Sequence, residues 1–386
     1  MTSCLEIDLA QLRENLDHFG KRVGPVVKIC GVVKADAYGL GAIPIARCLA
    51  ISGIEFLAVY SPAQAAVLEE SGVVCPMMVL MPIRWSHELV RLERAISQER
   101  LHLTIHDEPQ LEQVNELGRH FGCRIAVHLH LDTGMSRGGL DVGQLGRILA
   151  AAPKCKFIRI AGLGTHFAAA DDDPEFSEQQ LGRLIDATDP HRAQLPHDLL
   201  IHASNTFGVL RDRRFHQTMV RVGLGLYGYG PRLMQYRGEP DMERDLCPIV
   251  RWSSELVHVH NYSQGSPVGY NCTYRLARPS RLGLVPVGYA DGYPLSLGGI
   301  SVVGIMSDST ACHVAPVLGK VNMDQIVVDL TDVPFPVDVG TPVELISSDP
   351  DSPYALERLA EQAGSSCYEL LCRLSARIPR RYLGGE

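Results

Sequence analysis

Short apolar runs alternate with amphipathic stretches along the chain from Val26 to Tyr229. Stretches such as IPIARCLAIS and PQLEQVNELGRH carry apolar residues at spacings of three and four, which is typical of helices that cover a core. The apolar runs predict eight strands, at Val26–Lys34, Phe56–Tyr60, Met77–Met81, Leu101–His106, Arg124–Asp132, Ile158–His166, Leu200–Ser204 and Met219–Leu224. Eight strand–helix units predict an α/β fold, an N-terminal (β/α)₈ TIM-type barrel. An open Rossmann-type sheet is the alternative, but no GxGxxG motif follows the first strand.

The pattern changes after the eighth strand. The segment Pro231–Cys247 is polar and rich in turn formers, which predicts a linker. Beyond it, alternating runs and closely spaced turns predict a C-terminal mainly-β domain with one helix at Ala355–Ala363. Before the barrel, Cys4–Asp8 predicts a strand that enters a helix. We therefore expect a barrel domain at residues 1–235 and a mainly-β domain at residues 245–386.

Composition and charge narrow the class of protein. Hydrophobic residues make up 46% and charged residues 21% of the 386, which is typical of a soluble globular chain. The net charge of -8 disfavours binding to nucleic acid or to an anionic membrane. No run is long enough to span a bilayer, and the first residues lack a basic-then-apolar signal pattern. The eleven cysteines contain no CxxC pair, so we expect reduced thiols, no metal site and a cytoplasmic location.

Polar residues gather where the predicted strands end, and in a barrel these ends form the active-site face. The first strand ends at Lys34, and the following strands contribute Arg137, His166, Asn205, Thr206 and Arg221, with the amides of Gly223 and Leu224. Each residue alone has an ordinary explanation, such as a solvated lysine, a core histidine or an ion-paired arginine. Their convergence on one rim predicts a functional site.

This set of residues has a chemical logic. A lysine amine held in a pocket can form a Schiff base with a carbonyl. Glycine-rich turns near the last strands of a barrel bind phosphate, and a hydroxyl such as that of Thr206 can assist. A lysine beside a phosphate cradle predicts pyridoxal 5'-phosphate, with Arg221 as the partner of its pyridine nitrogen. Because a guanidinium does not give up its proton, that nitrogen would stay unprotonated, which favours a short-lived carbanion.

Nine segments occur in an order that resembles one known family. They are VVKADAYGLG, LDTGMSRGGL, THFAAAD, HASNT, RVGLGLYG, VGYNCTY, VPVGYADGYP, GKVNMDQIVVDL and CYELLCRLSARIPRRY. Together they resemble the alanine racemases, which are fold-type III enzymes dependent on pyridoxal phosphate. The resemblance implies a homodimer with active sites shared across the interface. It also implies an isomerase that interconverts L- and D-alanine and supplies D-alanine for peptidoglycan.

The resemblance also implies roles for two bases. Lys34 would carry the cofactor and exchange a proton on one face of the substrate, and Tyr270 of the partner subunit would act on the opposite face. Racemisation needs two bases because the proton leaves one face and returns on the other. A free tyrosine has a pKa of about 10, too high for a good base at neutral pH. A hydrogen-bonded chain through His166 and Arg221 would assist it.

Further roles follow from the same resemblance. Arg137 would lie near the cofactor's phenolic oxygen and the substrate carboxylate. Tyr289 and Met323 of the partner would shape a narrow entrance suited to alanine. The groups expected to bind the cofactor, most of them at its phosphate, are Tyr38, His166, Asn205, Thr206, Arg221, Gly223, Leu224 and Tyr368.

Three positions depart from the family pattern. Many relatives carry a carbamylated lysine at the position of His130, so Arg137 would be held here by chloride, water or another carboxylate. Asn322 replaces a common cysteine, and Leu40 replaces a frequent histidine. A racemase of broader range, for example for serine, lysine or arginine, therefore remains an alternative. A non-catalytic pyridoxal-phosphate protein and a decarboxylase of the same fold are disfavoured by the β domain and by VGYNCTY.

Overall fold

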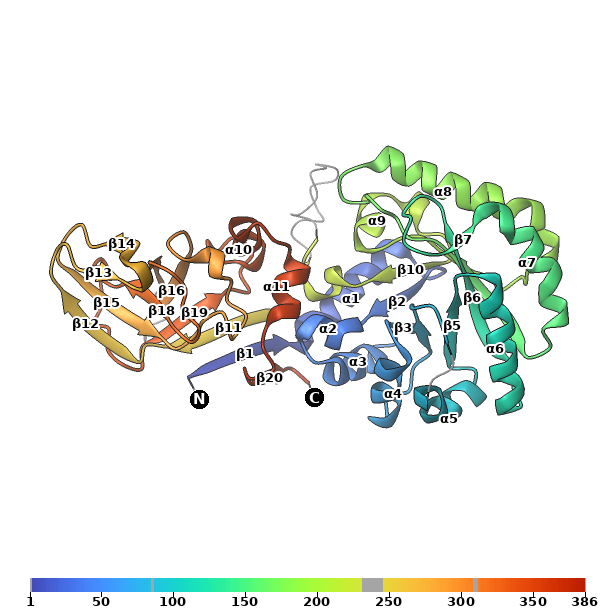
Figure 1. Cartoon of the computed structure of the whole chain (residues 1–386), viewed down its shortest axis with the longest axis horizontal. Helices are drawn as coiled ribbons and strands as arrows, with labels where there is room; N and C mark the ends of the chain where they lie inside the picture. Colours follow the sequence, from blue (N-terminus) through green and yellow to red (C-terminus); the bar gives the residue numbers. More distant parts are fainter. Residues whose placement is uncertain (1, 85–86, 231–245, 308–311, 386) are drawn as a thin grey trace.

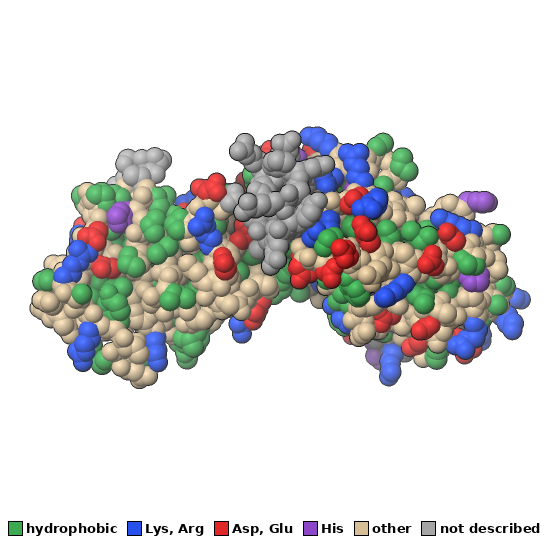
Figure 2. Space-filling view, turned by 90° about the horizontal axis from the view of Figure 1, so that it is seen from above, with side chains coloured by type: hydrophobic (Ala, Val, Ile, Leu, Met, Phe, Trp, Pro, Cys, Tyr) green, Lys and Arg blue, Asp and Glu red, His purple; other side chains and the backbone are tan. Residues whose placement is uncertain are grey.

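A computed structural model of the protein describes residues 2–84, 87–230, 246–307 and 312–385. The molecule is elongated, with a barrel lobe at one end and a sheet-rich C-terminal lobe at the other (Figure 1). Seen from above, the barrel lobe carries charged side chains of both signs, and hydrophobic side chains are exposed on the C-terminal lobe (Figure 2). Among the described residues, no helix is long and apolar enough to cross a membrane.

Eight parallel strands form the barrel, as predicted. In spatial order they are β10 (Met219–Val222), β2 (Lys28–Val32), β3 (Phe56–Val59), β4 (Met77–Val79), β5 (Leu101–Ile105), β6 (Ile125–Asp132), β8 (Ile158–Gly164) and β9 (Leu200–His202). A short β7 (Leu140–Asp141) pairs with β6. Backbone hydrogen bonds from Thr218 to Ile201 (3.1 Å) and from Arg221 to Ser204 (3.0 Å) link β10 to β9, so the ring is nearly closed.

Helices and helical turns follow the strands, and most of them cover the outside of this ring. They are α1 (Leu9–Val23), α2 (Lys34–Gly39), α3 (Ala42–Ile51), α4 (Pro62–Glu70), α5 (Glu93–Ser97), α6 (Glu108–Phe121), α7 (Leu145–Ala151), α8 (Pro174–Thr188) and α9 (Thr206–Arg211). Local sequence explains where several of them begin. Ser61, Asp107 and Asp173 accept backbone N–H bonds as N-caps of α4, α6 and α8, and each of these helices has a proline in its first turn. The caps fix the helix starts and leave the preceding loops at the barrel mouth.

The predicted barrel strands begin where the structure begins them, within two residues, but most end earlier than predicted. The first was predicted to reach Lys34 and ends at Val32, and the sixth was predicted to reach His166 and ends at Gly164. The runs of apolar residues continue beyond the last residues that pair in the sheet, because the turns that face the cavity are also buried. Lys34 and His166 therefore lie on turns above the strands.

The C-terminal lobe contains a nine-stranded sheet. Its order is β12 (His258–Tyr262), β15 (Ser280–Val285), β18 (Ile326–Asp329), β17 (Cys312–Leu318), β16 (Val302–Met306), β19 (Pro342–Ile346), β11 (Val250–Glu255), β1 (Ser3–Asp8) and β20 (Arg380–Leu383). A separate hairpin joins β13 (Pro267–Val268) to β14 (Tyr274–Arg275). The predicted mainly-β character is confirmed, and so is the late helix, α10 (Leu356–Ala363).

The strand β1 corrects the predicted domain division. It pairs antiparallel with β11 and parallel with β20, so it belongs to the C-terminal sheet, although residues from 1 onward were expected in the barrel. The alternating burial of β1 would fit either lobe. Its partner strands lie more than 200 residues away in the sequence, so the local pattern of residues cannot identify them. The predicted linker Pro231–Cys247 lies almost wholly outside the described residues, so the rest of the division stays a proposal.

Candidate active site

A cavity of about 570 Å³ opens at the carboxyl ends of the barrel strands. This volume lies in the range of small-molecule sites. Many of the predicted residues line it: Lys34, Tyr38, Arg137, His166, Asn205, Thr206, Arg221, Gly223, Leu224 and Tyr368. Of the described residues that line it, none is an aspartate or a glutamate, whereas one is a lysine and two are arginines. The cavity therefore favours an anionic ligand.

Lys34 lies at the start of an unusual turn. From Ala35 to Tyr38 the φ angles are 51–59°, so four consecutive non-glycine residues adopt the left-handed conformation. Each such residue costs about 1–2 kcal/mol relative to the right-handed form. These four residues, and not the glycines that follow them, make most of the turn. Gly39 (φ 80°) and Gly41 (φ 96°) only complete it, and the strained residues hold Lys34 toward the cavity.

Contacts from the C-terminal residues of the chain hold this strained turn in place. The guanidinium of Arg380 donates to the Gly39 carbonyl at 2.9 Å, and the Tyr382 hydroxyl donates to the Leu40 carbonyl at 2.9 Å. Leu40, one of the three departures from the family pattern, is fully buried in the core. Its apolar side chain and its carbonyl both anchor the turn, which explains a leucine at this position.

Burial is the largest influence on the Lys34 amine. It lowers the pKa of Lys34 below its usual value, and the positive charges of Arg137 and Arg221 lower it further. A larger fraction of the amine is then neutral near pH 7 than for a surface lysine. The neutral amine is the form that attacks a carbonyl.

The predicted phosphate-binding groups are assembled at one end of the cavity. A Cβ atom on Gly223 would lie 2.3 Å from the Tyr38 hydroxyl, so only glycine fits there. The Thr206 hydroxyl accepts from the amides of Gly223 and Gly225, each at 3.2 Å. Tyr368, carried by α11 (Cys367–Arg373), places its ring 5.7 Å from that of Tyr38. This is a compact cradle of hydroxyl and amide groups.

The ionisation of the two tyrosines suits this cradle. Burial raises the pKa of Tyr368 to about 12 and raises that of Tyr38 as well. Both hydroxyls therefore keep their protons at neutral pH and can donate to an anion. Asn205, also predicted here, lines the cavity while its side-chain oxygen caps α9 through the Gly208 amide at 3.0 Å.

Arg221 is buried and extensively hydrogen-bonded. Its guanidinium donates to the carbonyls of Thr165 (2.7 Å), Ala203 (3.3 Å) and His202 (3.2 Å). It also contacts the ring nitrogens of His202 and of His166, the latter at 3.2 Å, which places the predicted Arg221–His166 pair together. Burial lowers the pKa of Arg221 to about 10, so the guanidinium stays charged at neutral pH.

Three predicted site residues lie outside this cavity. Tyr270, Tyr289 and Met323 are all in the C-terminal lobe, with 68%, 45% and 55% of their surface exposed. Backbone hydrogen bonds of 3.0 Å, from Tyr289 to Asn322 and from Ala290 to Met323, hold two of the loops together. All three side chains are exposed on the C-terminal lobe of the single chain.

The loops that carry Tyr289 and Met323 are also fixed by charge. Arg377 donates to Asp291 and to Asp324, each at 2.7 Å. In the sequence, Asp291 lies two residues after Tyr289, and Asp324 comes directly after Met323. One guanidinium thus holds both loops, so the exposed side chains are presented on a defined framework.

Models of two protein domains cover nearly the whole chain. "Alanine racemase, N-terminal domain" matches residues 7–231, and "Alanine racemase, C-terminal domain" matches residues 249–382. The chain belongs to the alanine racemase family. The protein is thus an isomerase, a racemase, and its family depends on pyridoxal phosphate.

Individual alanine racemases resemble the chain over its full length. The enzyme of Halothermothrix orenii is 33% identical, over 98% of this chain and 96% of that protein. The structure of the alanine racemase from D-cycloserine producing Streptomyces lavendulae superposes with a TM-score of 0.88 at 26% identity, covering 100% of this chain and 98% of that one. The Bartonella henselae alanine racemase, solved with covalently bound pyridoxal phosphate, gives 0.82 at 26% identity, covering 99% and 100%.

His130 is the position where the resemblance implied a carbamylated lysine in many relatives. It lines the cavity with its ring 4.9 Å from that of His106, and burial lowers the pKa of His130 to about 3. A neutral imidazole cannot supply the negative charge of a carbamate. Among the described residues, no carboxylate forms an ion pair with Arg137.

Sequence reasoning missed one side of this alanine racemase cavity. Tyr60, Leu80, Pro82 and His106 line it from the ends of β3, β4 and β5. Tyr60 and His106 ended two of the predicted strands, so strand position alone could have identified them. They belong to none of the motifs in the sequence, so their residue types alone did not indicate a role in the site.

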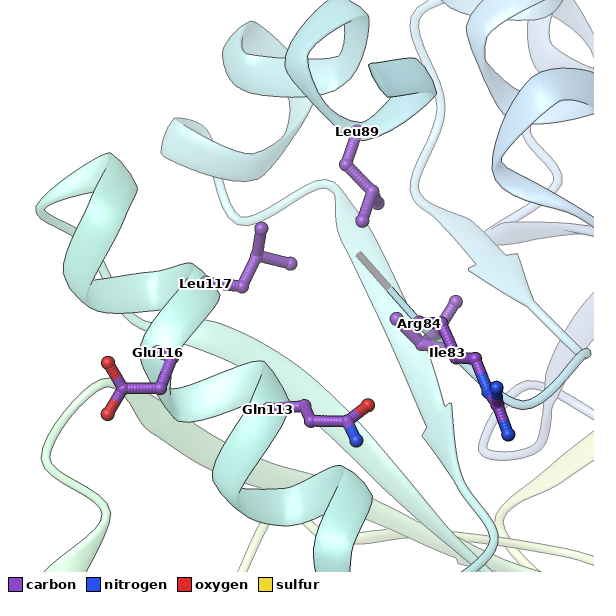
Figure 3. Close-up of a pocket in the computed structure, with 6 residues that line it drawn as sticks. All are labelled: Ile83, Arg84, Leu89, Gln113, Glu116 and Leu117. Atoms are coloured by element: carbon purple, nitrogen blue, oxygen red, sulfur yellow. The ribbon is translucent and has the colours of Figure 1, made fainter. Parts of the chain in front are cut away.

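A second hollow, of about 420 Å³, lies on the outer side of the barrel between α6 and the turn η1 (His87–Leu92). Figure 3 shows Leu89 and Leu117 facing into it, with Glu116 pointing away. Its described lining residues include no lysine, histidine or cysteine.

Proposed function

We propose that the protein interconverts L- and D-alanine with pyridoxal 5'-phosphate, in a homodimer, and that its D-alanine serves peptidoglycan synthesis. One observation carries the proposal. In a chain of the alanine racemase family, the barrel cavity joins Lys34 to a cradle of hydroxyls and amides and to Arg221, and its described lining residues include no carboxylate.

The residues present fit the cofactor. A side chain on Gly223 would fill the cradle, and the positive lining suits a phosphate. Lys34 would bind the aldehyde, and Arg221 would face the pyridine nitrogen. The phosphate would be held by Tyr38, Thr206, Gly223, Leu224 and Tyr368. When bound, the cofactor supplies an electron sink for the carbanion at the substrate's Cα.

Two bases on opposite faces would move the proton. Lys34 serves one face, and we propose that Tyr270 of the partner subunit serves the other, because Tyr270 is exposed and far from its own chain's cavity lining. His166 supports this assignment. Its Nδ1 accepts from Arg221, so the neutral ring keeps a proton on Nε2 and can donate to an incoming tyrosine oxygen.

Substrate binding would use the remaining cation. Arg137 is exposed at the cavity and has no carboxylate partner among the described residues, so it is available for the substrate carboxylate. Tyr289 and Met323 of the partner would narrow the entrance, which favours a methyl side chain. The Asn322 side-chain oxygen is buried without a hydrogen-bond partner, which suits a group arriving from a second subunit.

A racemase of broader range is the second candidate. The cavity extends to Tyr60, Pro82 and His106, beyond the groups proposed to hold cofactor and alanine. That side could receive a longer side chain.

Racemisation of a panel of optically pure amino acids, with pyridoxal phosphate added, decides between the two. We expect alanine to have the highest kcat/KM. A strong preference for a long or basic side chain would establish the broader racemase, and unchanged L-alanine with full cofactor loading would refute catalysis.

A further inference from the structure

Three buried histidines form a hydrogen-bonded chain through the barrel interior behind Arg221. His202 Nδ1 contacts the Arg221 guanidinium, and His202 Nε2 lies 2.9 Å from His128 Nδ1. His128 Nε2 in turn lies 2.9 Å from His102 Nδ1. His102, on β5, bonds the backbone carbonyl of Glu99 at the opposite end of the strand from the cavity. The chain thus crosses the barrel from the site to its floor.

The direction of every bond in this chain is fixed by Arg221. A guanidinium has donors and no acceptor, so His202 Nδ1 must accept. A neutral His202 then carries its proton on Nε2 and donates to His128 Nδ1. The same step repeats from His128 to His102, whose Nε2 proton goes to the Glu99 carbonyl. All three rings must therefore be the Nε2–H tautomer.

The rings are also neutral. Burial lowers the pKa of His102 to about 4 and lowers those of His128 and His202 well below their usual value. Each neutral ring in this tautomer is a dipole whose negative end, Nδ1, points toward Arg221. Hydrogen bonds aligned in one direction polarise one another, which strengthens the acceptor at the end of the chain.

Arg221 needs such support because its charge is buried without a counter-ion. It is 7% exposed, and among the described residues no carboxylate forms an ion pair with it. In the part of the chain that the structure describes, the acceptors bonded to its N–H groups are carbonyl oxygens and imidazole nitrogens. A buried charge is costly unless it is well hydrogen-bonded.

We infer that His128 and His102 are positioning residues that hold Arg221 through His202, as an oriented chain of dipoles in place of a carboxylate. The inference rests on the proposed function for its catalytic consequence only. Without His102, the Nε2 proton of His128 has no acceptor, and the order of the chain is lost. Arg221 would then be less firmly aligned with the cofactor's ring nitrogen.

Nitrogen NMR of the histidine-labelled holoenzyme tests the direction of the chain. Long-range ¹⁵N–¹H spectra report the tautomer of each ring, and the contact between His102 and Phe56, at 5.0 Å between centroids, helps to assign the first ring. We expect His102, His128 and His202 all as neutral Nε2–H forms. A single Nδ1–H or doubly protonated ring among them overturns the inference, whether or not the protein racemises alanine.

Variants of His102 test the coupling. His102→Leu removes the acceptor, and His102→Asn keeps an oxygen near the position of Nδ1. In His102→Leu we expect the ¹⁵N shifts of His202, two links away, to change and kcat to fall about threefold or more at unchanged KM. His102→Asn should recover most of both.

His216→Leu is the matched control. His216 is also a buried histidine, but it does not belong to the hydrogen-bonded row of His202, His128 and His102, and it bonds the Val209 carbonyl at 3.1 Å. His216→Leu should leave the His202 shifts unchanged. Two results would contradict the inference: unchanged ¹⁵N chemical shifts of His202 in His102→Leu, or the same loss of kcat in His102→Leu and His216→Leu. Either result would show that His102 only fills space in the core. Should His102→Leu fail to fold, the tautomers of the unaltered protein still decide the direction.

Discussion

At the scale of single residues, the reactivity of Lys34 follows from its surroundings. Burial and two neighbouring guanidinium groups both disfavour the ammonium form. Neither effect is visible at Lys34 itself in the sequence, because Arg137 and Arg221 are far away along the chain. The fold makes an ordinary lysine into a nucleophile.

Replacing Lys34 with alanine tests its role directly. Lys34→Ala should abolish the visible absorbance of the covalently bound cofactor and lower racemisation by at least about 10³-fold. Absorbance spectra of the purified variant with added pyridoxal phosphate provide the measurement. Retention of the covalent band would place the cofactor lysine elsewhere.

The lowered pKa of Lys34 predicts a pH dependence. Capture of pyridoxal phosphate by cofactor-free protein needs the neutral amine, so the rate should rise with pH and level off above the pKa. We expect the inflection below 10.5, the ordinary value for a lysine. Stopped-flow absorbance between about pH 6 and pH 10 measures it.

Arg137→Ala tests whether the positive charge of Arg137 contributes to the lowered pKa of Lys34. Removing this positive charge, the second influence after burial, should move the inflection upward. An inflection at the ordinary lysine value in the unaltered protein would contradict the prediction.

Tyr270→Phe removes only a hydroxyl. The variant should keep the cofactor absorbance of the unaltered protein, while racemisation falls by about 10²–10⁴, the usual contribution of a general base. Polarimetry from each pure enantiomer gives the rates. Equal rates for variant and unaltered protein would remove Tyr270 from the mechanism.

At the scale of elements, the turn at α2 shows how distant parts of the chain stabilise local strain. The left-handed residues from Ala35 to Tyr38 persist because Arg380 and Tyr382 hold the carbonyls that follow them. A Cβ on Gly41 would lie 2.0 Å from the Tyr382 hydroxyl, so this contact requires glycine.

Two glycine variants separate strain from collision. Gly53 has a positive φ, and a Cβ atom there would meet no other atom. Gly53→Ala should therefore lower the free energy of unfolding by about 1 kcal/mol, from backbone strain alone. Gly41→Ala adds the collision and should lower it by about 2–4 kcal/mol. Urea denaturation compares them. Adding Tyr382→Phe to Gly41→Ala should recover part of the loss, and equal losses in the two single variants would exclude the collision.

Elements were predicted from sequence to different extents for physical reasons. Strand starts were correct because capped helices and loops precede them, whereas strand ends ran on into buried turns. The left-handed turn was not predicted, since alanine and tyrosine do not favour it and only tertiary contacts support it. The cavity residues on or just after β2, β6, β8, β9 and β10 were found from strand position. Tyr270 needed the resemblance, because no local pattern places an exposed tyrosine at a site.

At the scale of the whole molecule, the proposed site is incomplete within one chain. The cavity holds Lys34, and the exposed side chains of Tyr270, Tyr289 and Met323 belong to the other lobe. A dimer in which each barrel meets the partner's C-terminal lobe would complete two sites.

Mixing two inactive variants tests this sharing. In a heterodimer of Lys34→Ala and Tyr270→Phe, one site carries both changes and the other carries neither. Reassembly of equal amounts should therefore restore about a quarter of the original activity. Each variant reassembled with itself is the control, and no recovery in proven heterodimers would show that each site uses residues of one chain.

The strand β1 has a consequence for how the protein is made. Its neighbours in the sheet, β11 and β20, leave the ribosome long after it, and Glu6 and the Arg381 that it pairs with are 375 residues apart. Domains generally begin to fold during synthesis, N-terminal parts first. The barrel can therefore form while β1 still exposes both edges, and unpaired edges promote aggregation. Nascent chains should accordingly depend most on chaperones between completion of the barrel and synthesis of β20.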